Sequence, residues 1–244
     1  SSEFTTAITG SSDAIDANKP DTATITGPAD GTYVVGNDLV FTVDFSEAVV
    51  VNGTPQLLLS NGAYASYDSD NASNNLSAGT LAFVYTVAEG DDDASDLTVA
   101  TDGLQLTGNS TIRDAAGNDA TLTLTSAFDS AVVVDANTPT ITAVSIPDAA
   151  MKVGQTVTAT ITVSGATGET LVLESGTIGG FTLGNLSKDS DTSYTATFTV
   201  TDGGTNVAAD ASIPVSITLS DPAGNTSSEF TTAITGSSDA IDAN

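Results

Sequence analysis

The sequence predicts an all-β protein, and three observations support this. Apolar and polar residues alternate with period two in many short windows, which is typical of strands with one buried face. One such window places Val157, Ala159, Ile161 and Val163 on one side and three threonines on the other. No window long enough to test shows helical spacing. Thr, Val, Ala, Ser, Gly and Asp dominate the composition, which favours short strands joined by polar turns.

The alternating windows fall into seven strands in each half of the chain, with turn residues between them. Seven short strands in about a hundred residues indicate an immunoglobulin-like, Greek-key β-sandwich, and a closed sheet is the alternative. The first half is predicted to form strands at 22–26, 38–45, 55–60, 63–68, 80–88, 97–107 and 120–134. The second half is predicted to form strands at 140–146, 155–163, 169–174, 178–184, 192–200, 212–219 and 228–235.

A long repeat frames the chain. Residues 1–18 recur without a change as residues 227–244. An identical run of this length indicates a tandem array of near-identical units, of which this chain holds one period and an overlap. We therefore expect residues 1–18 to be the terminal strand and linker of a preceding repeat, with no independent structure of their own.

A shorter repeat lies inside the period. The motif D-x-A-G-N occurs at Asp114–Asn118 and at Asp221–Asn225, and an Asp-Ala-Asn tripeptide follows each copy at the same spacing. The two halves also match near their starts. The sequence therefore predicts two tandem sandwich domains, 19–137 and 138–244, of a size that is normal for such folds.

The charge of the chain is extreme. Thirty-one acidic residues face only four basic ones, which gives a formal net charge of -27. Nucleic acid is excluded as a partner, because phosphate binding needs clustered Lys and Arg, and contact with an anionic membrane is disfavoured. Self-repulsion of this size destabilises a compact state unless counterions relieve it. Bound divalent cations and a merely solvated acidic surface both remain open explanations.

The composition also argues against an enzyme. The chain has no His, no Cys and no Trp. Nothing titrates naturally near neutral pH, and no Ser has a His to activate it. A glycosidase needs only two carboxylates, but sugar sites usually use aromatic platforms, and aromatic residues make up 5% of this chain. We therefore expect no small-molecule substrate.

Several segments carry a family resemblance. The first half contains FTVDFSEAVVVNGTPQLLLSNGAYASYD, TLAFVYTVAEGDDD and IRDAAGN, which resemble the bacterial Ig-like repeats of giant RTX adhesins of marine Gram-negative bacteria. The second half contains SIPDAAMKVGQTVTATITV and TIGGFTLGNLSKDSDTSYTATFTVTDGG, which are similar to the extender repeats of these adhesins, ice-binding members included. The glycine-aspartate nonapeptides of the family are absent here.

The resemblance implies a structural role. It implies a spacer that is rigidified by calcium at its domain junctions and that projects a distal ligand-binding region for cell adhesion and biofilm formation. It further implies an extracellular location on the cell surface, in an exported adhesin anchored at the outer membrane. The expected partners are neighbouring identical repeats of the same chain, and the segment itself is expected to be a monomer without membrane contact. The alternative function is a carbohydrate-binding or ice-binding β-sandwich module.

Candidate calcium ligands concentrate where the predicted domains meet. Calcium takes six to eight hard oxygens, and no EF-hand loop occurs, so a site has to assemble from separate loops. In a seven-strand sandwich, the loops that share a pole with the linker carry most of the carboxylates. A plain turn, in which Asp accepts backbone hydrogen bonds and Gly supplies a positive φ, is the alternative for D-x-A-G-N. The candidate ligands are Asp16, Asn18, Asp30, Glu89, Asp91, Asp93, Asp114, Asn118, Asp135, Asn137, Asp148, Asp202, Asp221, Asn225, Asp242 and Asn244.

Overall fold

The described part of the chain is built from strands and turns. A computed structural model describes residues 16–93, 95–165, 168–235 and 240–244. Every regular element in these ranges is a strand, which confirms the all-β prediction. In the part of the chain that the structure describes, no helix has the length and hydrophobicity that a membrane crossing requires. The expectation for residues 1–18 concerns mainly residues 1–15, which lie outside the described residues.

The chain divides into two compact units, which are described separately. Unit 1 consists of Ser1–Pro28, Leu39–Tyr85 and Thr98–Ser130, and unit 2 of Ala29–Asp38, Thr86–Leu97 and Ala131–Asn244. Both units are discontinuous in sequence, whereas the predicted domains 19–137 and 138–244 are continuous. This division therefore does not test the predicted bounds, which stay a prediction.

Unit 1 is organised around one large sheet with the strand order β1-β3-β7-β6-β5-β9. Strand β3 forms its centre because its alternating residues Leu39, Phe41, Val43 and Phe45 are buried. A second, two-stranded sheet joins β4 and β10. The bounds are β1 Thr22–Thr26, β3 Asp38–Phe45, β4 Val50–Asn52, β5 Gln56–Leu58, β6 Tyr64–Tyr67, β7 Thr80–Thr86, β9 Leu104–Gln105 and β10 Thr111–Arg113.

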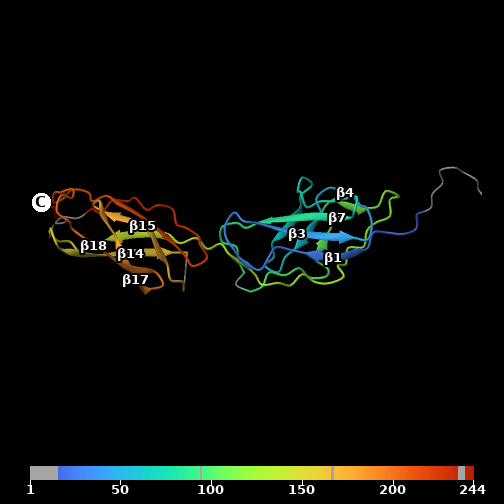
Figure 1. Ribbon diagram of the computed structural model, residues 1–244, viewed down its shortest axis with the longest axis horizontal. Coiled ribbons are helices and arrows are strands. Elements are labelled where there is room, and N and C mark those ends of the chain that lie inside the picture. Colours follow the sequence, from blue (N-terminus) through green and yellow to red (C-terminus); the bar gives the residue numbers. More distant parts are fainter. Residues whose placement is uncertain (1–15, 94, 166–167, 236–239) are drawn as a thin grey trace, which may run out of the picture. The chain divides into compact units, whose positions relative to one another are not determined.

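Unit 2 contains a two-layer sandwich (Figure 1). One layer has the order β12-β14-β18-β17 and the other the order β16-β15-β19. Val157, Ala159, Ile161 and Val163 of β14 are buried in its core, as their alternation predicts. The layers are open sheets with edge strands, so the closed-sheet alternative is wrong here. The bounds are β12 Thr140–Ser145, β14 Thr156–Ser164, β15 Val172–Ile178, β16 Phe181–Thr182, β17 Gly184–Ser190, β18 Ser193–Thr199 and β19 Val215–Ser220.

Two small sheets complete unit 2. One has the order β2-β11-β8, and the other pairs β13 with β20 in parallel. The sheet β2-β11-β8 leads the chain into the Asp-Ala-Asn linker that follows β11. The bounds are β2 Gly31–Tyr33, β8 Asp92–Asp93, β11 Val132–Asp135, β13 Met151–Lys152 and β20 Ile241–Asp242.

Several predicted strand boundaries in unit 2 are wrong. The predicted strands 169–174 and 178–184 are replaced by one strand, β15, followed by a tight hairpin and β16. Gly179 and Gly180 form the two-residue turn, since both have a positive φ and the flanking Ile178 and Phe181 are paired. This is the turn chemistry that two consecutive glycines favour in a hairpin. The glycine pair therefore ends β15 at Ile178, although the apolar pattern of the sequence continues through the turn into Phe181.

Candidate metal centres

The two D-x-A-G-N segments fold into the same turn. In each, the Asp side chain accepts hydrogen bonds at Oδ1 from the backbone N–H of the Gly and of the Asn. For Asp114 these distances are 2.7 and 2.8 Å, and for Asp221 both are 2.8 Å. The Asn side chain donates to Oδ2 of the same Asp at 2.7 and 2.8 Å, respectively. Each turn thus fixes its Asp carboxylate with hydrogen bonds from within the turn.

The Asn of each turn also holds an Asp-Ala-Asn linker. Nδ2 of Asn118 donates to the backbone oxygen of Asn18 at 2.8 Å and to that of Asp16 at 3.3 Å. Nδ2 of Asn225 donates to the backbone oxygen of Asp135 at 2.9 Å. The repeated motif is therefore a turn that also clamps a linker, which the turn-only alternative does not include.

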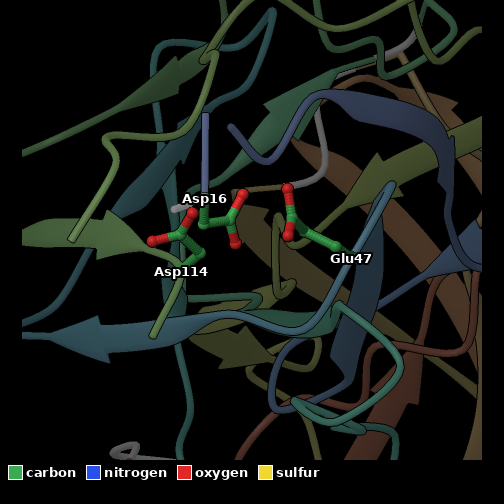
Figure 2. Close-up of side chains that lie close together, drawn as sticks. All are labelled: Asp16, Glu47 and Asp114. Atoms are coloured by element: carbon green, nitrogen blue, oxygen red, sulfur yellow. The ribbon is translucent and has the colours of Figure 1, made fainter. Parts of the chain in front are cut away.

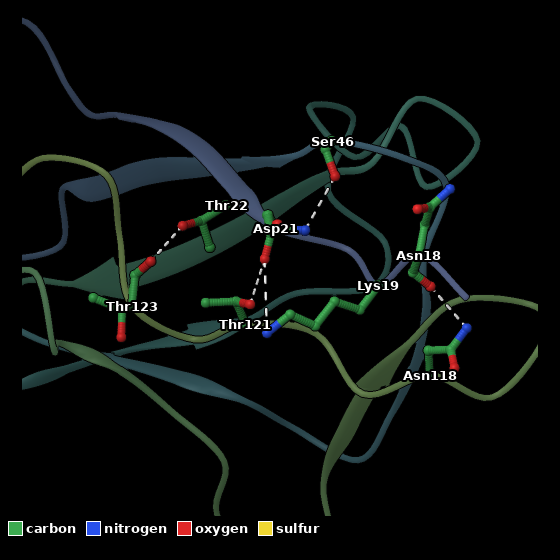
Figure 3. Close-up of polar contacts among 8 residues, drawn as sticks. All are labelled: Asn18, Lys19, Asp21, Thr22, Ser46, Asn118, Thr121 and Thr123. Atoms are coloured by element: carbon green, nitrogen blue, oxygen red, sulfur yellow. Dashed lines mark hydrogen bonds and ion pairs between the residues drawn. The ribbon is translucent and has the colours of Figure 1, made fainter. Parts of the chain in front are cut away.

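Polar contacts tie down the chain that follows the first linker (Figure 3). The backbone N–H of Asp21 donates to Oγ of Ser46 at 3.0 Å, and its carboxylate accepts from Thr121. Lys19 lies 4.0 Å from the same carboxylate. These contacts keep the linker residues beside the loop that follows β3 and beside the D-x-A-G-N turn.

Three carboxylates converge at this place in unit 1. Asp16 comes from the linker, Glu47 from the loop after β3, and Asp114 from the D-x-A-G-N turn. Figure 2 shows the three side chains side by side. One carboxylate oxygen from each lies within 4.8 Å of the others. Asp114 is buried, Glu47 is half-buried and Asp16 is exposed, so the cluster opens to solvent at the linker.

A second cluster with the same origins lies in unit 2. Asp135 comes from the linker, Glu169 from the loop after β14, and Asp221 from the second turn. Their carboxylate oxygens also lie within 4.8 Å of one another. These two are the groups of three acidic side chains that converge in this way among the described residues. Each cluster therefore draws one carboxylate from each of the same three kinds of segment.

Glu169 is positioned by the sandwich core. The hydroxyl of Tyr194 on β18 donates to the backbone oxygen of Glu169 at 2.8 Å and accepts from the N–H of Leu171 at 3.2 Å. Tyr194 is only 1% exposed, so this contact is firmly packed. Oε2 of Glu169 is buried and accepts no hydrogen bond from the described residues. A buried carboxylate oxygen without a donor is costly unless a cation or a proton meets it.

The pKa values in unit 1 reflect two opposite effects. Partial burial and then the negative charges of Asp16, Asp114 and Asp21 raise the pKa of Glu47. Burial by itself would also raise the pKa of Asp114. The hydrogen bonds from the side chain and backbone of Asn118 and from the adjacent turn amides outweigh it, so the pKa of Asp114 lies below its ordinary value. Folding therefore favours the ionised form of Asp114 and the protonated form of Glu47.

In unit 2, burial and charge repulsion act on the pKa values in the same direction, and burial is the larger cause. Burial and then the charges of Asp135, Asp221 and Asp92 raise the pKa of Glu169, although Lys188 opposes them. The pKa of Asp135 is raised as well, first by burial and then by its acidic neighbours. Without a cation, each cluster thus holds negative charges that destabilise one another.

These shifts predict a pH dependence. A carboxyl whose pKa is raised on folding binds protons more tightly in the folded state, so stability falls as pH rises through the raised pKa. In chelator, we expect the free energy of unfolding to increase as the pH is lowered from 7 to about 5. Below the ordinary carboxyl pKa of about 4, Asp114 reverses the trend, since its pKa is lowered by folding.

Urea unfolding at several pH values measures this. Replacing the two glutamates with Glu47→Gln and Glu169→Gln removes titrating groups with raised pKa values and should flatten the increase. A wild-type chain that loses stability steadily from pH 7 to 5 in chelator would contradict the prediction.

The acidic loop after β7 also contacts the second linker. Glu89 accepts from the N–H of Thr138 at 3.1 Å and from its hydroxyl at 2.7 Å. Asp92 accepts from the side chain of Asn137 at 3.2 Å. Ala136 and this loop exchange two backbone hydrogen bonds of 2.9 Å, from the N–H of Gly90 and to the oxygen of Asp91. The loop therefore holds the linker in place through both side-chain and backbone hydrogen bonds.

The remaining candidate ligands do not join either cluster. Asp30 accepts from the N–H of Ala131 at 3.1 Å, at the entry to β11. Asp93 accepts from Ser95, and its strand β8 pairs with β11. The other candidates, Asp148, Asp202, Asp242 and Asn244, are exposed and form no cluster of three carboxylates among the described residues. Metal binding by all of these residues stays a prediction.

Glu47 and Glu169 are not among the ligands predicted from the sequence. A signal for them existed, because each is the acidic residue in the loop that follows the long buried strand of its half, β3 or β14. Glu47 follows the end of β3 by two residues, whereas Glu169 follows the end of β14 by five. The unequal spacing hides the correspondence from a motif search.

Comparison with known proteins supports the fold. Residues 135–238 match the family described as bacterial Ig-like domain. This match and the sheets described above confirm the predicted immunoglobulin-like β-sandwich. Comparison with curated protein sequences gives no match.

Two solved structures illustrate the similarity. The chain is similar to the Escherichia coli adhesin FdeC, with 19% identity, a TM-score of 0.29 and coverage of 87% of this chain. It spans 63% of that chain, which is less than two thirds of its length. It is also similar to a segment of three titin Ig domains, with 9% identity, a TM-score of 0.37 and coverage of 93% of this chain and 67% of that one.

Proposed function

We propose that this chain is a non-catalytic spacer repeat in the stalk of an extracellular adhesin of the RTX type, stiffened by calcium at its linkers. The observation that carries the proposal is the duplicated cluster, in which a linker Asp, a loop Glu and a turn Asp converge within 4.8 Å in each unit. The exact repeat of 1–18 at 227–244 supports a tandem array, and the bacterial Ig-like match of residues 135–238 supports a structural module.

The donor set of each cluster suits calcium. Three carboxylates offer up to six hard oxygens, and calcium takes six to eight with flexible geometry, water included. Asp135, Glu169 and Asp221 would hold the ion in unit 2, and Asp16, Glu47 and Asp114 in unit 1. Oε2 of Glu169 is buried without a hydrogen-bond donor, and the pKa of the Glu169 carboxyl is raised. Both features are expected of a carboxylate whose charge a bound cation would neutralise.

Calcium would supply charge neutralisation and cross-linking. The turn and the loop belong to the folded body of each unit, whereas Asp16 lies in the first linker and Asp135 is the last residue of β11, where the second linker begins. An ion held by all three would tie a linker to a fixed position and restrict its backbone. In this proposal, a long array of such repeats projects a distal binding region from an anchor at the outer membrane, in cell adhesion and biofilm formation.

Amide exchange in the second linker tests the proposal. We expect residues 135–138 to exchange at least about tenfold more slowly in calcium than in chelator, which corresponds to about 1.4 kcal/mol of added local stability. Asp221→Asn should remove most of this protection, because it replaces the negatively charged carboxylate that the turn contributes to the calcium site with a neutral amide. Asp70→Asn, at an exposed turn outside both clusters, is the matched control.

Two outcomes would contradict the proposal. One is equal exchange of residues 135–138 in calcium and in chelator. The other is specific retention of this chain on a glycan array or on ice, which would favour a binding module instead of a spacer.

A further inference from the structure

The described parts of the segment 227–244, residues 227–235 and 240–244, lie along unit 2 as a set of separate strand pairings. Phe230 and Ile217 exchange two backbone hydrogen bonds of 2.9 and 3.2 Å, and Ile234 and Ile213 exchange two of 3.0 and 2.9 Å. Ile241 then pairs with Val207 in the same way, at 2.8 and 2.9 Å. Strand β20 also runs parallel to β13. The segment therefore binds through its own backbone at several positions.

The same segment places apolar anchors in the core. Ile234 is 8% exposed, Ile241 is 1% exposed and Ala243 is fully buried. The space for Ile241 is closely shaped, because a Cβ on Gly179 would lie 2.7 Å from its Cδ1. Unit 2 thus contains a groove that binds the segment's backbone by hydrogen bonds and selects its sequence through the buried side chains of Ile234, Ile241 and Ala243.

A second copy of that sequence exists in every chain. Residues 1–18 are identical to residues 227–244, so Phe4, Ile8, Ile15 and Ala17 correspond to Phe230, Ile234, Ile241 and Ala243. The groove has no chemical basis for distinguishing the two segments. We propose that residues 1–18 of a second copy replace residues 227–244 in unit 2, so that copies associate head to tail by strand exchange.

Concentration decides which segment occupies the groove. The contacts are the same in both states, so the exchange itself is nearly neutral in contact energy. The chain's own segment is tethered and has an effective concentration in the millimolar range. Dilute chains should therefore keep their own segment and remain monomeric. Copies of this chain at about 1 mM should exchange to a measurable extent.

Thiol cross-linking tests the exchange in the whole 244-residue chain, whose sequence contains no Cys. Oγ of Ser216 donates to Glu229 at 2.6 Å, and Glu229 corresponds to Glu3 in the first segment. In the variant Ser216→Cys with Glu3→Cys, a short bis-maleimide should link two chains after incubation at about 1 mM. The linked dimer should exceed that of Ser216→Cys alone by at least tenfold.

Two further variants complete the experiment. Ser216→Cys with Glu229→Cys should link within one chain and shows that the reagent spans the site. Adding Ile8→Asp and Ile15→Asp to the test variant should abolish the linked dimer, because both anchors are lost while unit 2 keeps its own segment. Peptide mapping identifies which two thiols are joined.

Each remaining outcome would overturn the proposal. A dimer yield no greater than that of Ser216→Cys alone means that no exchange occurs. Equal yields with and without Ile8→Asp and Ile15→Asp mean that the contact is nonspecific. A link from Glu3→Cys to Ser216→Cys inside one chain means that no second copy takes part.

Discussion

In about 10 mM calcium, we expect the chain to melt about 10–20 °C higher than in chelator. Extracellular calcium modules bind at about 0.1–1 mM, so the tighter end of that range gives a hundredfold excess of the ion. An ion that binds only the folded state then adds about 2.7 kcal/mol. For a unit of about 100 residues, each kcal/mol shifts the melting temperature by about 4–8 °C. Calorimetry in calcium and in chelator measures the difference.

Screening must be separated from binding in this experiment. A net charge of -27 makes any salt stabilising, so both samples need the same ionic strength. The double variant Glu47→Gln, Glu169→Gln should lose most of the calcium-dependent gain and should be more stable than wild type in chelator, since repulsion within both clusters is reduced. Glu229→Gln, on an exposed residue outside both clusters, is the matched control. Equal calcium-dependent gains in wild type and in the double variant would exclude binding at these clusters.

The sequence predicts the layers of the fold well and its connections less well. Alternation correctly identifies β3 and β14, because a strand with one face in the core has to alternate. It fails over 120–134, where the only regular strand is β11 at Val132–Asp135. The earlier part of that window makes single contacts instead, for example Leu124 with Thr101 and Phe128 with Val99. Alternation reports which side chains are buried, and a loop that lies across a core shows the same pattern as a strand.

The candidate site divides in the same way. Asp114, Asp221 and the linker residues Asp16 and Asp135 are found from the sequence because they belong to repeated motifs with fixed local geometry. The glutamates that complete the clusters are placed by tertiary packing. Tyr194, for instance, holds the backbone of Glu169 from a strand that lies 25 residues away in sequence. No local pattern encodes that contact.

Asn225 offers the sharpest mutational test of the clamp between turn and linker. Its side chain is buried, at 4% exposure, and donates to Oδ2 of Asp221 and to the backbone oxygen of Asp135. Asn225→Ala leaves both acceptors without this donor, and an unsatisfied buried acceptor costs about 1–3 kcal/mol. We expect a loss of about 2–4 kcal/mol in the free energy of unfolding. The measurement is urea unfolding in chelator, so that metal binding does not contribute.

The first turn provides a matched comparison inside the same chain. Asn118 donates the equivalent hydrogen bonds to Asp114 and to the first linker but is only half-buried. In Asn118→Ala, water can therefore donate hydrogen bonds to the acceptors that lose this side chain. Asn118→Ala should therefore cost less, about 1–2 kcal/mol. Asn109→Ala, at an exposed position, should stay within about 0.5 kcal/mol of wild type. If Asn225→Ala is as mild as Asn109→Ala, the linker is not held by the turn, and the shared geometry of the two motifs has no mechanical consequence.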